Sequence, residues 1–216
     1  MATANGMARE ALGYLDGHLG DWKRVLVDLC RIPSMSASGF PVEQVRRSAQ
    51  AVAQALTDAG VENVQVLTIP GVHPYVYGDW LHRPDAPTVL LYGHHDVQPP
   101  GREDKWLSPA FEPTERDGRL YGRGTADDKG GVMAHVAAVG SYLRSAGTLP
   151  VNVKFIIEGE EEIGSMNLGR FLEQYRKSVS ADFIVLTDTG NYDVGHPALT
   201  YQLRGLCELD VEVQAL

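Results

Sequence analysis

Hydrophobic and polar residues follow two different periods along the chain. Apolar residues recur at helical spacing over residues 12–29 and again between Pro41, which suits a first helical turn, and Gly60, which suits a helix end. Short apolar or alternating runs further along predict strands at 63–69, 73–81, 88–92, 151–157 and 183–186, the last of them buried. Two further helices are expected at 131–145 and 166–177. This alternation predicts an α/β fold with a mostly parallel sheet flanked by helices.

Residues 207–215 form a separate pattern, in which apolar residues alternate strictly with polar ones. This alternation is typical of a half-buried strand, which needs a neighbouring strand and a surface to cover. We expect residues 1–205 to be the N-terminal part of one domain, and residues 206–216 to be the first strand of a second domain. The alternative is that residues 206–216 form an edge strand of the first sheet.

Composition and charge narrow the class of protein. The 216 residues are 44% hydrophobic and 22% charged, which excludes wholesale disorder. The net charge of −9 argues against nucleic acid as a partner. No apolar run approaches the roughly 20 residues of a membrane span, so we expect no membrane partner. The chain has only two cysteines, Cys30 and Cys207, whereas a secreted domain held by disulfides usually has more, so we expect reduced thiols and a cytoplasmic protein. Neither belongs to a CxxC pair, which argues against a cysteine zinc site.

Four segments rich in histidine, acids or glycine follow predicted strands or precede a predicted helix. They are Gly93–Asp96, Gly122–Gly131, Glu158–Ser165 and Thr187–Asp188. Sites in open α/β sheets form at the carboxyl ends of strands, where such segments would meet. The glycine-rich segment lacks the GxxxxGK[ST] order of a phosphate loop, and its paired acids would repel phosphate.

Each segment alone has a simpler interpretation. His94 would be a surface histidine, Asp127 and Asp128 would be helix caps, and the glutamates would be a solvated charge run. Like charges at the end of a buried strand, however, need a cation or shared protons. One histidine with several carboxylates suits zinc or a similar divalent ion, and a carboxylate that bridges two metals is a hydrolytic arrangement.

Together, these segments resemble the dizinc peptidases that include carnosinases, cytosolic nonspecific dipeptidases, aminoacylases and related deacylases. The matching motifs are Gly-His-His-Asp-Val-Gln-Pro from Gly93, Gly-Arg-Gly-Thr-Ala-Asp-Asp-Lys-Gly-Gly from Gly122, Glu-Gly-Glu-Glu-Glu-Ile-Gly-Ser from Glu158, and Thr187-Asp188. The segments 76–80 and 106–111 look most like the dipeptidase branch. The resemblance covers nearly all of the chain from Ile32 onward.

The resemblance implies a role for each site residue. His94 and Asp188 would bind one zinc, Asp127 would bridge two zinc ions, and Glu162 would bind the second. Glu161 would be the general base, and Asp96 would orient His94. His95 is the alternative ligand, but the family spacing His-x-Asp favours His94. The family also places a cis peptide after the bridging aspartate, which is Asp127 here. Manganese or cobalt would suit these ligands too.

Complete members of this family are longer than this chain. They carry a lid or dimerisation domain and then a segment that completes the catalytic domain, so we expect residues 1–205 to be only the N-terminal part of that domain. The implied function is hydrolysis of the amide bond in dipeptides or small peptides by water activated at two metals, in a homodimer. We expect this chain alone to be weakly active or inactive. The alternatives are an N-acyl amino acid deacylase of the same family and a non-catalytic metal-binding fragment.

Overall fold

The computed structural model describes residues 4–214, and its elements follow the expected order. The helices are α1 (Ala4–Cys30), α2 (Val42–Ala59), α3 (Lys129–Ala146), α4 (Leu168–Gln174) and α5 (Arg176–Val179). The strands of the main sheet are β1 (Glu62–Leu67), β2 (Tyr75–Trp80), β3 (Thr88–His94), β6 (Asn152–Glu158) and β7 (Phe183–Leu186). A small hairpin consists of β4 (Thr114–Arg116) and β5 (Arg119–Tyr121), and two 3₁₀ turns are η1 (Glu103–Lys105) and η2 (Glu161–Ile163).

The main sheet has the strand order β1-β2-β6-β3-β7. Strands β6, β3 and β7 are parallel to one another, β2 is antiparallel to β6, and β1 is antiparallel to β2. Strand β1 therefore points the same way as the parallel strands, and β2 alone runs against them. The α/β class with a mostly parallel sheet is confirmed. Strand β2 can reverse because the short segment 68–74 that links it to β1 suffices for an antiparallel pair.

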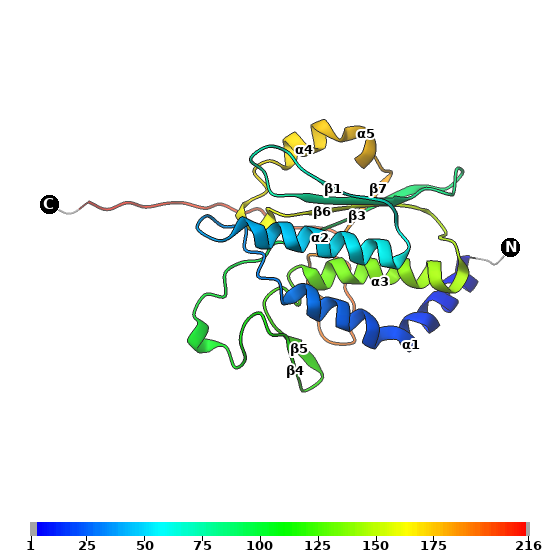
Figure 1. The fold of residues 1–216 in the computed structure, drawn as a ribbon, viewed down its shortest axis with the longest axis horizontal. Helices are drawn as coiled ribbons and strands as arrows, with labels where there is room; N and C mark the ends of the chain where they lie inside the picture. Colours follow the sequence, from blue (N-terminus) through cyan, green and yellow to red (C-terminus); the bar gives the residue numbers. More distant parts are fainter. Residues whose placement is uncertain (1–3, 215–216) are drawn as a thin grey trace.

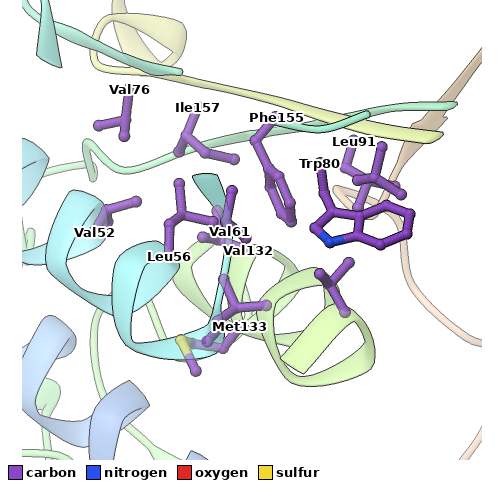
Figure 2. Packing of buried hydrophobic residues seen from close by; sticks show 14 of the residues in the cluster. Val52, Leu56, Val61, Val76, Trp80, Leu91, Val132, Met133, Phe155 and Ile157 are labelled. Carbon is purple, nitrogen blue, oxygen red and sulfur yellow. The ribbon is translucent and has the colours of Figure 1, made fainter. Parts of the chain in front are cut away.

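Helices cover both faces of this sheet (Figure 1). Helices α2 and α3 lie against one face, with α1 packed on α3, while α4 and α5 lie over the other face. Helix α2 buries residues at helical spacing, among them Val45, Ala49, Val52 and Leu56. Figure 2 shows Val52 and Leu56 of α2 together with Phe155 and other side chains from β2, β3, β6 and α3 in the larger core cluster. The core thus fixes the strands whose carboxyl ends carry the candidate chemistry.

Two elements differ from the sequence prediction. The helix expected at 166–177 is divided at Tyr175 into α4 and α5. Strand β7 was predicted to be buried, and this is wrong, because its side chains are exposed, with Phe183 at 62%. Strand β7 is at the edge of the sheet and pairs only with β3, so its apolar sequence does not lead to burial within this chain.

The hairpin of β4 and β5 was not predicted, because its strands have only three residues each. Its turn contains Asp117 and Gly118, both with positive φ, and an Asp-Gly pair is a known hairpin signal. After β7, residues 187–214 contain no helix or strand and include one isolated bridge, between Asp193 and His196. The alternating segment is therefore unpaired over 207–214, and its assignment to a second domain stays a prediction. Within the described residues, no helix is long and apolar enough to cross a membrane.

Candidate metal centre

The last residues of three parallel strands lie at one edge of the sheet. Strand β3 ends at His94, which is paired with Glu158 at the end of β6, and β7 ends two residues before Asp188. The fourth segment reaches the same place from the loop before α3, which carries Asp127. The carboxyl ends of parallel strands are where α/β proteins form their sites, so segments up to 94 positions apart in sequence meet here.

His94, Asp127 and Asp188 form one group whose possible ligand atoms all lie within 4.8 Å of one another. Nε2 of His94 is 3.0 Å from Oδ1 of Asp127 and 3.7 Å from Oδ2 of Asp188. The imidazole is fully buried, whereas both aspartates are exposed. Among residues 4–214, no other such group of histidine, cysteine and acidic side chains is found. One imidazole nitrogen and two carboxylates fit a divalent ion such as zinc.

The electrostatics of His94 also favour a cation at this position. Nδ1–H donates to the backbone oxygen of Asp96 at 3.1 Å, so Nε2 is the atom that faces the carboxylates. Burial opposes a charged ring, but the hydrogen bond and charge of Asp96, with the charges of Asp128 and Glu161, outweigh it and raise the pKa of His94 to about 10. The carboxylates thus stabilise positive charge on Nε2, where a bound metal ion would supply it instead.

Asp96 connects His94 to the turn that carries two of the predicted site residues. Its carboxylate is fully buried and accepts a hydrogen bond from Ser36 at 2.5 Å. It also accepts the backbone N–H groups of Glu161 at 3.2 Å and Glu162 at 3.1 Å. Asp96 therefore holds the imidazole through its backbone oxygen, with Oδ1 3.4 Å from Nδ1, and holds η2 through its carboxylate. The sequence motif did not reveal this second contact.

The four glutamates at the end of β6 and directly after it form two pairs. Glu158 and Glu160 are buried, where Glu158 accepts the hydroxyl of Ser165 at 3.0 Å and that of Tyr92, and Glu160 accepts the backbone N–H of Asn167 at 2.9 Å. The side chain of Glu161, in contrast, faces the centre, with Oε2 3.8 Å from Nε2 of His94. Glu158 and Glu160 thus stabilise the structure, whereas Glu161 and Glu162 are available for chemistry.

Glu162 lies beside the centre but outside the group of three. Its Oε1 accepts the backbone N–H of Gln98 at 3.0 Å, and its own backbone oxygen accepts the side chain of Gln98 at 2.8 Å. Burial, together with nearby negative charge, raises the pKa of both Glu161 and Glu162. Gln98, a motif residue with no predicted role, therefore positions a predicted ligand.

The loop before α3 places Asp127 by means of its neighbours. The peptide bond from Asp127 to Asp128 is cis, as the resemblance implied. Asp128 occupies the N-cap position of α3, as the helix-cap interpretation expected, but its side chain makes no capping hydrogen bond. It accepts the backbone N–H of His94 at 3.1 Å instead. Burial raises the pKa of Asp128 to about 7. Lys129, also buried, donates to the backbone oxygens of Leu29 and Ile32.

Two further histidines, His95 and His135, are buried outside the group of three. His95 is fully buried and donates from Nε2 to the backbone oxygen of Pro74 at 3.0 Å, so it does not join the centre. Burial lowers the pKa of His95 to about 4. His135 is buried on α3 and bonds both Tyr92 and Thr187. No motif identified His135, because its partners are distant in sequence.

Comparison with known proteins adds an independent line of support. The sequence model of Peptidase family M20/M25/M40 matches residues 90–214. Over 97% of its length the chain is 36% identical to Beta-Ala-His dipeptidase of Mus musculus, of which it covers 45%. It is 33% identical to Cys-Gly metallodipeptidase dug1 of Schizosaccharomyces pombe, with 85% of this chain and 41% of that protein covered. The crystal structure of human carnosine dipeptidase 1 superposes with a TM-score of 0.75 at 34% identity, covering 85% of this chain and 41% of that one. The chain spans less than half the length of these relatives.

Proposed function

We propose that this chain, which belongs to Peptidase family M20/M25/M40, supplies part of the active site of a metal-dependent dipeptidase. The reaction would be hydrolysis of the amide bond in dipeptides or small peptides. The convergence of His94, Asp127 and Asp188 at one sheet edge, with Glu161 beside them, is the observation that carries the proposal. The named relatives are dipeptidases, which favours this substrate class over N-acyl amino acids.

His94, Asp127 and Asp188 would hold one metal ion, and Asp127 with Glu162 would hold part of a second site. Zinc suits this mixture of imidazole and carboxylate ligands, and manganese or cobalt would also fit. When bound, such ions polarise the substrate carbonyl and make water more acidic. Asp96 would keep Nε2 of His94 directed at the ion, because it accepts the hydrogen bond from the opposite side of the ring.

Glu161 would act as the general base. It would take the proton from the attacking water and donate it to the leaving amine nitrogen. A raised pKa suits this task, since the same group must both accept and release a proton near neutral pH. The hydrogen bond from its backbone N–H to Asp96 would hold Glu161 in place during the transfer.

The test is the substitution Glu161→Gln, with Glu173→Gln on the exposed surface of α4 as the matched control. We expect any dipeptide hydrolysis by the zinc-loaded chain to fall by about 100-fold or more with Glu161→Gln, because a general base contributes that much. Zinc content should not change in either variant, and Glu173→Gln should leave hydrolysis unchanged. A panel of dipeptides and acetylated amino acids in the same assay tests the substrate class.

Two results would contradict this proposal. Hydrolysis that survives Glu161→Gln would exclude Glu161 as the base. A wild-type chain that binds no divalent ion would exclude the metal centre. Zinc binding without hydrolysis would support the alternative of a non-catalytic metal-binding fragment. A homodimer and a cytoplasmic location remain predictions.

A further inference from the structure

Asp188 occupies the least supported position in the candidate centre. It follows β7, which pairs only with β3, and the register of that pair ends at Leu186. The side chains of β7 are exposed, and residues 187–214 form no helix or strand. A ligand at the end of an exposed edge strand needs an anchor, because a metal site requires its ligand atoms to be held in place before the ion binds.

The side chain of Thr187 provides such an anchor. Its Oγ1 lies 3.1 Å from Nε2 of His135, a residue on the first half of α3 that is only 5% exposed. The same Nε2 lies 3.2 Å from the backbone oxygen of Tyr92 on β3. Because a carbonyl oxygen only accepts, Nε2 must carry the hydrogen, which it shares between Tyr92 and Thr187. In the described part of the chain, this is the one side-chain hydrogen bond that joins residues 187–189 to the rest of the protein.

His135 is itself rigidly held. It lies on the first half of α3, whose neighbouring residues Val132, Val136 and Val139 are part of the main core. Burial lowers the pKa of His135 to about 4, so the ring is neutral at physiological pH and keeps one N–H to donate. Its bond to Tyr92 reaches β3 two residues before His94. The imidazole ring of His135 thus connects the end of β7 to β3, the strand that carries His94.

The backbone of α3 leaves room for this arrangement at Gly131. A Cβ built on Gly131 would lie 2.7 Å from Oγ1 of Thr187, closer than real contacts allow. Thr187 therefore rests directly on the first turn of α3, between a glycine and a buried imidazole. The fit is steric as well as polar, which limits the positions that Thr187, and with it Asp188, can take.

We propose that His135 and Thr187 are positioning residues that hold Asp188 in place to bind metal beside His94. This inference rests on the proposed metal centre and names two residues outside it. Neither residue would touch the ion. They would hold Asp188 in its binding position before the ion arrives, which lowers the entropy lost on metal binding. Their loss would therefore weaken metal affinity more than it lowers the stability of the fold.

The experiment compares Thr187→Val, which keeps the shape and removes the hydroxyl, with Thr187→Ser, which keeps the hydroxyl. Zinc affinity is measured on the full 216-residue chain by competition with a chromophoric chelator, and the melting temperature is measured on the metal-free chain. We expect zinc affinity to fall about 10- to 100-fold with Thr187→Val, as it does when groups that orient metal ligands are removed. Thr187→Ser should bind zinc nearly as well as the wild type. The melting temperatures of the metal-free variants should stay close to that of the wild type.

A second substitution tests whether the two residues act through one bond. His135→Leu should weaken zinc binding at least as much as Thr187→Val, because it also removes the bond to Tyr92. Adding Thr187→Val to His135→Leu should cause no further loss, because their shared interaction can be lost only once. If His135→Leu fails to fold, the Thr187 pair carries the test.

Three results would overturn the inference: unchanged zinc affinity in Thr187→Val, losses that multiply in the double variant, or a lower melting temperature with unchanged zinc affinity. A wild-type chain that binds no zinc would refute the metal centre itself.

Discussion

At the scale of single residues, burial decides which members of a motif are free to react. The sequence shows four glutamates between positions 158 and 162 but not the direction in which each points. In the structure, Glu158 and Glu160 bond to tyrosine, serine and asparagine partners. Glu161, in contrast, faces the centre, and Glu162 lies beside it, where it bonds to Gln98. Those partners come from β2, β3 and the turn before α4, so residue spacing alone could not separate the two pairs.

Gly131 gives a prediction at this scale. A Cβ at this position would lie 1.9 Å from Oδ1 of Asp128, so Gly131→Ala must displace the residue next to Asp127. Alanine normally favours a helix over glycine by up to about 1 kcal/mol, but forced overpacking costs about 1–3 kcal/mol. We expect a lower melting temperature and weaker zinc binding.

The matched control for this prediction is Gly169→Ala in α4, where a new Cβ would meet nothing within 4 Å. Thermal unfolding and a zinc titration compare the two variants. Gly169→Ala should melt at or slightly above the wild-type temperature. If Gly131→Ala matched the wild type in both measurements, the close packing around Asp128 would be wrong.

At the scale of elements, hydrophobic periodicity was sufficient to predict the position of each helix or strand that packs on the core. The helices α1, α2 and α3 and the strands β2, β3 and β6 appear where the pattern placed them, because each has an apolar side that the core covers. Strand β7 exists as predicted but is exposed, since an apolar run does not specify how many neighbours a strand has. The three-residue strands β4 and β5 are too short for any period to be visible.

The two cysteines test the placement of α1 and of the segment after β7. Cys30 ends α1 and is fully buried, and burial raises the pKa of its thiol to about 11. Cys207 is exposed. Because the thiolate is the reactive form, a disulfide reagent at pH 8 should modify Cys207 quickly and Cys30 only after denaturation.

The control for the thiol prediction is Cys207→Ser, which should abolish the fast phase and leave the slow one. Absorbance of the released thiol dye follows both phases. Two fast thiols in the native chain would show that α1 does not end in the core as the structure describes.

At the scale of the whole molecule, the centre depends on topology more than on any motif. Four segments far apart in sequence meet because β3, β6 and β7 are parallel and adjacent, an arrangement that the alternation of strands and helices predicts only in outline. The sequence therefore identified the segments that carry His94, Asp127, Glu161 and Asp188. It could not identify Gln98 or His135, because the contacts of Gln98 with Glu162, and of His135 with Tyr92 and Thr187, depend on the fold and not on residue type.

The measurement that tests the central claim most directly is the zinc content of the purified 216-residue chain after zinc reconstitution and removal of loosely bound metal. The group of three ligands predicts about one tightly bound ion per chain, since it is the only such group in the described residues. His94→Ala should reduce this content to near zero, whereas His82→Ala, at an exposed histidine, should not change it. A wild-type chain without bound zinc, or a His94→Ala variant that retains it, would contradict the account.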